Sequence, residues 1–181
     1  SQATRRVCAG EIGQSFERGN TALAVEDYYH IINYKTAELF YVSCHLGAKL
    51  AGYDDGFISA AGRFGRSLGI AYQIFDDIAD FIGQEDRIGK TLGTDVASGK
   101  FTLPLILLLR KLGRMEGKEL VRTFHNGNPA DIRGLNRLMT EKGIFDEVNQ
   151  CFQREIEKAE KALDPFSDYP PTNHLKGISA Y

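Results

Sequence analysis

The stretch GFISAAGRFGRSLGIAYQIFDDIAD, residues 56–80, decides the fold. Its apolar side chains recur every three or four residues, which is the spacing of one buried face of an α-helix. They are Phe57, Ala61, Phe64, Leu68, Ala71, Phe75 and Ala79. Asp54 and Asp55 offer an N-cap, so we expect a helix that runs from there to about Ile82.

Two more helices are expected on the N-terminal side of this stretch. Residues 3–18 read as a helix end that Gly19 and Asn20 close. Residues 26–50 form a second periodic segment, and Gly52 lies just past its end, as is typical of a C-terminal cap. The apolar residues that give it helical spacing are Ile31, Tyr34, Leu39, Val42 and Leu46.

The C-terminal side alternates loops and shorter helices. Residues 83–101 carry four glycines and read as a loop with one short helical turn. Thr102 can cap the next helix, with Pro104 in its first turn, where a missing N–H costs little. Further helices are expected at 116–125, 129–142 and 144–163, and the proline-rich tail 164–181 is expected to dock loosely. No strand pattern is visible, so residues 1–181 predict one all-α domain, an antiparallel helix bundle.

Composition excludes several classes of protein. The 181 residues carry 22 basic and 24 acidic side chains, and a net charge of -2 argues against a nucleic-acid surface. Three widely spaced cysteines without a CxxC pair do not suggest a disulfide framework or a zinc site. No segment approaches the roughly 20 apolar residues of a membrane span, and no secretion signal is visible, so we expect a cytoplasmic protein.

The three aspartates that end the quoted stretch are the strongest functional signal. Asp76 and Asp80 are one helical turn apart and share a face, and Asp77 lies at its flank. Converging carboxylates repel one another unless a cation lies between them, and Mg²⁺ prefers such hard oxygen ligands together with phosphate oxygens. An acidic end on a solvated helix is the alternative interpretation of this short motif.

A glycine-rich loop with lysines follows the aspartates. Lys90 and Lys100, each preceded by glycine, could meet phosphate charge that a metal leaves uncompensated. The segment 89–91 reads GKT, but a nucleotide P-loop would need glycine at position 84, where the chain has Gln84, and a strand before it. A solvated loop with incidental lysines is the other alternative.

These elements together resemble the trans-isoprenyl (polyprenyl) diphosphate synthases. The resemblance rests on residues that occur in the order and near the spacing of that family. They are Gly10, Glu11, Ile12 and Gln14; the segment 34–37, YKTA; Tyr72, Gln73 and the DDIAD of 76–80; Gly83; the segment 89–91, GKT, and 93–95, GTD; Gly99, Lys100 and Pro104. It covers about residues 5–110 strongly and implies the all-helical isoprenoid synthase fold.

The resemblance implies a prenyltransferase that condenses an allylic prenyl diphosphate with isopentenyl diphosphate. Asp76, Asp77 and Asp80 match the second aspartate-rich motif, which binds Mg²⁺ on the allylic diphosphate. Substrate-binding positions are matched by Lys35, Thr36, Gln73, Lys90, Lys100 and Gln14, and the catalytic set by Asp76, Asp77, Lys35 and Lys90. The implied chemistry is loss of diphosphate to give an allylic cation, and Tyr72 and Phe75 are expected to pack in the core beside it.

The first aspartate-rich motif of the family is absent from this sequence. We therefore expect a chain that begins after the first half of the fold, is inactive alone, and works as a homodimer or with a partner chain. The alternatives are a regulatory or structural subunit of a heteromeric synthase, a helical scaffold with an incidental acidic cluster, and a terpene cyclase. The Lys35-Thr36 and Gly89-Lys90 pairs argue against the cyclase.

Overall fold

The computed structural model describes residues 1–82, 93–125 and 132–179, which form helices and connecting turns without any strand. The chain divides into two compact units, which we describe separately. The helices are α1 (Gln2–Phe16), α2 (Val25–Ile32), α3 (Glu38–Leu50), α4 (Asp55–Ile82), α6 (Thr94–Ala97), α7 (Leu103–His125), α8 (Ile132–Glu141), α9 (Ile144–Leu163) and α10 (Pro170–Ser179). This confirms the all-α expectation, and no described helix is long and apolar enough to cross a membrane.

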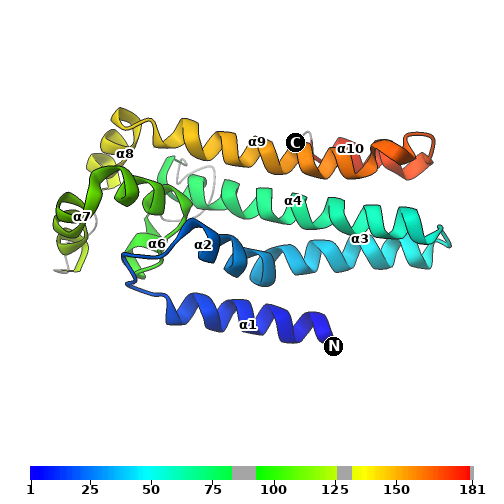
Figure 1. Ribbon diagram of the computed structural model, residues 1–181, viewed down its shortest axis with the longest axis horizontal. Coiled ribbons are helices and arrows are strands. Elements are labelled where there is room, and N and C mark those ends of the chain that lie inside the picture. The colour runs from blue at the N-terminus through cyan, green and yellow to red at the C-terminus, as the bar shows by residue number, and fades with distance from the viewer. Residues whose placement is uncertain (83–92, 126–131, 180–181) are drawn as a thin grey trace. The chain divides into compact units, whose positions relative to one another are not determined.

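The first unit comprises residues 1–11, 31–73 and 151–181. The first part of α4 lies between α3 on one side and the end of α9 on the other (Figure 1). Its core contains Phe57 and Phe64 of α4, Ala48 of α3, and Ala159 and Leu163 of α9. Each large side chain buried in this way stabilises the fold by about 1.5–3 kcal/mol.

The start of α4 forms as the sequence predicts. The carboxylate of Asp54 accepts the N–H of Phe57 at 3.1 Å, which is an N-cap bond. Gly52, with φ of 80°, ends the preceding helix in the left-handed conformation that glycine adopts most easily.

The tail does not dock loosely, contrary to expectation. Residues 164–166 form a 3₁₀ turn and α10 follows. The ring of Tyr169 stacks on Phe57 with centroids 5.0 Å apart, and the ring of Phe166 meets Phe57 edge-to-face at 5.6 Å. The Tyr169 hydroxyl donates to Asp54 at 2.6 Å. The aromatic residues Phe166 and Tyr169 therefore anchor the tail, although its prolines suggested loose docking.

A π-helical turn, Asn33–Ala37, joins α2 to α3, where the sequence predicted one regular helix. A π turn contains an extra residue and rotates the following side chains around the helix axis. Glu38 and Ala48 are consequently buried in α3, while Leu39 and Leu46 are exposed, against the apolar pattern that predicted them inside.

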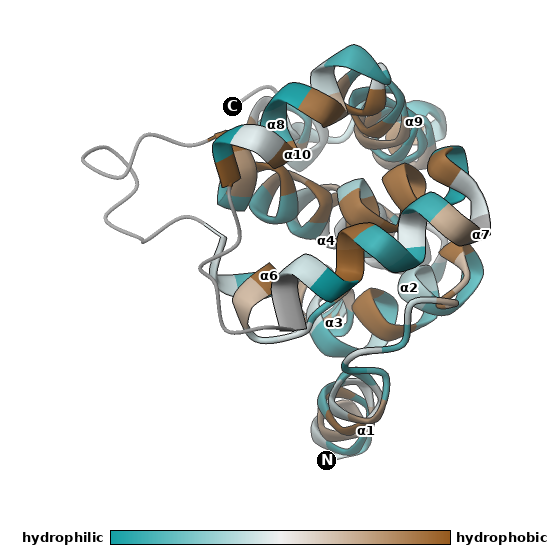
Figure 2. Ribbon diagram, turned by 90° about the vertical axis from the view of Figure 1, so that its left-hand side faces the viewer, coloured by the Kyte–Doolittle hydropathy of each residue, from teal (hydrophilic) through white to brown (hydrophobic). Residues whose placement is uncertain are grey.

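The second unit comprises residues 12–30 and 74–150. Its core joins Phe81 of α4, Leu108 of α7, Met139 of α8 and Val148 of α9, all fully buried. α8 is strongly amphipathic, with hydrophobic and hydrophilic residues on different sides (Figure 2).

One expectation for α7 is confirmed and another needs correction. Residues 103–125 consist of two helical stretches that meet at a kink at Gly113, where φ is 76° and ψ is 179°, which agrees with the separate helix expected from residue 116. The hydroxyl of Thr102 is buried and finds no hydrogen-bond partner among the described residues, so Thr102 does not cap α7 through its side chain. Its backbone carbonyl accepts the N–H of Ile106 instead.

Candidate functional site

The acidic end of α4 lies in the second unit, and Asp77 is held there by a tyrosine. Asp77 is only 3% exposed, and its Oδ2 accepts the hydroxyl of Tyr28 at 2.6 Å. Tyr28, on α2, is equally buried. A buried carboxylate needs such donors because burial without them is costly. Tyr28 therefore positions Asp77, a role that the sequence did not indicate.

Asp80 forms hydrogen bonds with the start of α6. It is 1% exposed, its Oδ1 accepts the hydroxyl of Thr94 at 3.0 Å, and its Oδ2 accepts the N–H of Asp95 at 3.1 Å. Its backbone carbonyl also accepts the N–H of Gly93 at 2.9 Å. Both side-chain oxygens thus satisfy groups at the N-terminus of this short helix, as a capping residue does.

The expectation that three carboxylates converge on one cation is not what the described residues show. Among residues 1–82, 93–125 and 132–179, no group of three or more acidic, histidine or cysteine side chains is close enough to hold a metal ion. Carboxylates are suitable donors for Mg²⁺. Asp76 is partly exposed, and the assignment of Asp76, Asp77 and Asp80 to Mg²⁺ stays a prediction.

Lys35 and Thr36 lie in the first unit, on the π-helical turn. Lys35 pairs with Glu11 of α1, with Nζ and Oε2 3.0 Å apart, and the Thr36 hydroxyl donates to Gln73 of α4 at 2.6 Å. π turns occur frequently at functional sites. The structure thus joins Thr36 to Gln73, two of the residues expected to bind substrate.

Gly10 brings α1 directly against this turn. A Cβ at Gly10 would lie 2.5 Å from the backbone nitrogen of Lys35 and 2.9 Å from the Cβ of Tyr34. Contacts that short do not occur between real side chains and backbone. Only glycine therefore allows α1 to support the turn that carries Lys35.

A buried ionic network next to the π turn escaped the sequence reasoning. Glu38 is 2% exposed, accepts Arg6 at 3.0 Å and Arg66 at 3.1 Å, and follows directly after the turn. Arg66 also donates to Asn33 at 2.7 Å and lies 4.4 Å from the centre of the Tyr41 ring. These contacts tie α1, the π turn and α4 together within the first unit. The placement of Glu38 depends on the π turn, which no sequence pattern predicted.

The remaining expected site residues have mixed outcomes. Lys100 forms an ion pair with Asp95 at 2.9 Å, on the same segment that Asp80 caps. Gln14 is partly buried near the end of α1. Lys90 lies outside the described residues.

Tyr72 and Phe75 are 54% and 60% exposed rather than packed in the core, because the buried face of α4 continues through Ile74, Asp77 and Phe81.

Comparisons with known proteins agree with this all-helical arrangement. The family model described as polyprenyl synthetase matches residues 1–140. Octaprenyl diphosphate synthase of Haemophilus influenzae is 30% identical over 180 residues, covering 98% of this chain and 54% of the relative. Heptaprenyl diphosphate synthase component 2 of Geobacillus stearothermophilus is 39% identical over 172 residues, covering 95% of this chain and 52% of the relative.

The solved structures agree as well. A polyprenyl synthase from Caulobacter crescentus CB15, complexed with calcium and isoprenyl diphosphate, superposes with a TM-score of 0.90 at 31% identity. The match covers 98% of this chain and 55% of that one. The fold is thus that of the all-α polyprenyl synthases, and the chain belongs to the polyprenyl synthetase family. It spans about half the length of the relatives it matches.

Proposed function

We propose that this chain supplies the allylic-diphosphate site of a polyprenyl diphosphate synthase. The reaction would condense an allylic prenyl diphosphate with isopentenyl diphosphate to make a longer trans-polyprenyl diphosphate. The chain would form the C-terminal portion of a single synthase domain. The proposal rests on the family and on the acidic end of α4.

The observation that carries the proposal is the burial of Asp77 and Asp80 within five residues that also include Asp76. Neighbouring buried carboxylates are unfavourable unless donors or cations compensate them. Tyr28 holds Asp77 in place, and Thr94 of α6 holds Asp80. The motif therefore has one fixed arrangement. A relative of 31% identity is described in complex with a divalent cation and isoprenyl diphosphate, which supports the same ligand class here.

In this proposal Asp76, Asp77 and Asp80 would hold Mg²⁺, while Lys35 and Lys90 would meet the diphosphate oxygens. Magnesium, when bound, would neutralise charge on the leaving diphosphate. Thr36 and Gln73, joined by their hydrogen bond, would present polar atoms to the same group. Lys100 and Gln14 remain predicted substrate contacts.

Calorimetry with Mg²⁺ and a non-hydrolysable allylic diphosphate analogue tests the proposal. Binding should need the metal and should weaken at least tenfold in Asp76→Asn. Asp55→Asn is the matched control, because Asp55 is an exposed aspartate at the other end of the same helix. Metal-independent binding, or equal loss in both variants, would contradict the proposal.

The 181-residue chain should not elongate prenyl chains by itself. The first aspartate-rich motif is absent from its sequence, so half of the expected catalytic surface is missing. Incorporation of labelled isopentenyl diphosphate by the purified chain would refute this. A matching polypeptide that carries the missing motif should restore incorporation if the site is intact.

A second candidate is a subunit of a two-component synthase, either catalytic or regulatory. It is favoured by the relative named heptaprenyl diphosphate synthase component 2. A regulatory subunit should associate with its partner yet show no metal-dependent diphosphate binding, and Asp76→Asn should leave the activity of the assembly unchanged. Sedimentation of the chain alone and with candidate partners separates a homodimer from a heteromer.

A further inference from the structure

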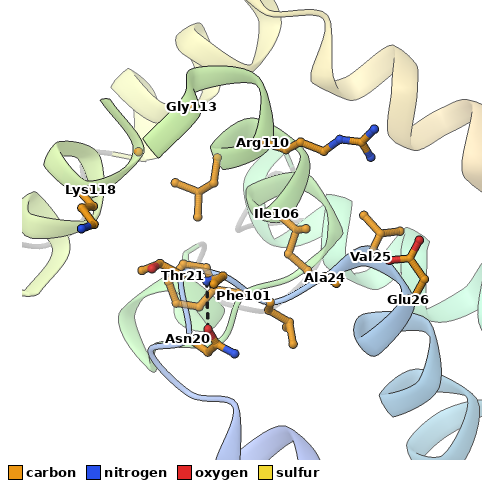
Figure 3. Close-up of a pocket in the computed structure, with 14 residues that line it drawn as sticks. Asn20, Thr21, Ala24, Val25, Glu26, Phe101, Ile106, Arg110, Gly113 and Lys118 are labelled. Atoms are coloured by element: carbon orange, nitrogen blue, oxygen red, sulfur yellow. Dashed lines mark hydrogen bonds between the residues drawn. The ribbon is translucent and has the colours of Figure 1, made fainter. Parts of the chain in front are cut away.

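The second unit contains a pocket of about 710 Å³ between residues 20–26 and α7 (Figure 3). Known small-molecule sites have volumes of roughly 300–1,000 Å³. The lining is mostly apolar and includes Leu23, Val25, Phe101, Ile106 and Leu109. None of its lining residues belongs to the candidate diphosphate site, so the pocket needs an explanation of its own.

The wall formed by residues 20–26 is held by local hydrogen bonds. The side-chain oxygen of Asn20 accepts the N–H of Ala22 at 2.9 Å, the bond drawn in Figure 3. Its side-chain nitrogen donates to Glu17 at 2.5 Å. Next to it, the N–H of Gly19 donates to the carbonyl of Gly99 at 2.9 Å. The pocket is therefore preformed, which lowers the entropy cost of binding.

The opposite wall depends on the break in α7. Gly113 has φ of 76° and ψ of 179°, a conformation that is essentially restricted to glycine. Gly117 leaves further room, since a Cβ there would lie only 3.3 Å from the Cδ2 of Leu109. Two glycines thus create space along this wall of the pocket.

The charged groups of the lining give the pocket a basic end. The lining contains two cations, Arg110 and Lys118, and one carboxylate, Glu26, for a net charge of +1. In Figure 3, Lys118 lies at one end, and Arg110 extends toward Val25 and Glu26 at the other. Neither cation forms an ion pair or hydrogen bond with any residue that the structure describes. The cation at the Lys118 end is thus not matched by a neighbouring carboxylate.

We propose that this pocket binds an anionic amphiphile with a linear hydrocarbon tail. The tail would lie along the apolar lining, and the anionic head would meet the ammonium group of Lys118. An inorganic anion would leave the apolar surface unused, and an uncharged alkane would leave Lys118 unused. The ligand class includes long prenyl phosphates and lipid-derived monoesters, which share this chemistry.

Calorimetry of the full chain with dodecyl phosphate below its micelle concentration tests the proposal, with EDTA present to exclude metal-dependent binding elsewhere. Octyl and decyl phosphate should bind more weakly, by about fourfold for each methylene that the pocket buries. Inorganic phosphate should not bind at the same concentrations. Equal affinity for all tail lengths would overturn the proposal.

Variants locate the binding. Lys118→Glu should weaken dodecyl phosphate at least tenfold, and Gly117→Leu should abolish binding by filling the pocket. Lys49→Glu, a matched charge reversal at an exposed position of α3, and Asp76→Asn should leave the affinity unchanged. Thermal melting checks that each variant folds. If Gly117→Leu does not fold, the result for Lys118→Glu decides the test.

Three further results would overturn the proposal. The first is unchanged affinity in folded Lys118→Glu. The second is loss of binding in Asp76→Asn, which would assign the ligand to the candidate diphosphate site. The third is binding to anionic phospholipid vesicles without binding of monomeric dodecyl phosphate, which would indicate a membrane surface instead. A prenyl monophosphate and a saturated alkyl phosphate of equal length, compared last, distinguish the two sources of the ligand. The compound that binds more tightly identifies the source.

Discussion

The bond between Tyr28 and Asp77 makes a sharp prediction for Tyr28→Phe. The substitution removes one hydroxyl from a side chain that is 3% exposed and leaves its shape intact. The lost hydrogen bond is 2.6 Å long, and its acceptor is the Asp77 carboxylate, which is equally buried. Hydrogen bonds to charged groups contribute about 1.5–3 kcal/mol, so the free energy of unfolding should fall by about that amount. With a urea slope of about 2 kcal/mol per molar, the midpoint should fall by about 1 M.

Tyr72→Phe is the control for that experiment. Tyr72 is half exposed, and its hydroxyl has no hydrogen-bond partner in the described part of the chain. It should change stability by less than about 0.5 kcal/mol. A double-mutant cycle with Asp77→Asn should give a coupling of about 1 kcal/mol or more. Equal effects of the two tyrosine variants, or additive effects in the cycle, would refute the inference that Tyr28 positions Asp77.

Three further predictions address other parts of the structure. Thr94→Ala removes one of the bonds to Asp80, so we expect a loss of about 0.5–1.5 kcal/mol in urea unfolding, with faster amide exchange in residues 94–97; unchanged stability would contradict the role of this bond. Gly113→Ala should lower the free energy of unfolding by about 1–3 kcal/mol, whereas Gly47→Ala, at an exposed position of α3, should be neutral or stabilising. Similar melting temperatures of the two variants would contradict the inference that the kink needs glycine. The Tyr169 hydroxyl and the Phe57 N–H lower the pKa of Asp54, so its contribution to stability is present above the ordinary aspartate pKa of about 3.9 and is lost as the pH falls through the folded pKa; Asp54→Asn should flatten the acid limb of the stability curve, and an unchanged limb would refute this.

The sequence predicted the elements whose signals are local. The bounds of α4 and α9 follow from helical periodicity, together with Asp54 as the N-cap of α4. The short turn α6 in the glycine-rich segment was also expected. Each of these depends on residues within a few positions of one another, which a linear pattern records.

Features that depend on distant partners were missed. The buried Glu38 needs Arg6 and Arg66, which lie 32 and 28 residues away in sequence. Tyr28 and Asp77 are separated by 49 residues, and nothing near either one indicates their hydrogen bond. The exposure of Phe75 was missed because the buried face drifts around a long helix, so a strict three-and-four pattern loses phase toward its end.

The π-helical turn has a consequence for how this chain tolerates insertions and deletions. Loss of one residue from 33–37 would remove the extra residue and let the backbone return to regular α-helical bonding, so the side chains of α3 would keep their places. Glu38 would still face Arg6 and Arg66. A gene variant shortened by one codon inside α3 itself would instead rotate every following side chain by about 100° and would lose the alignment between the helices.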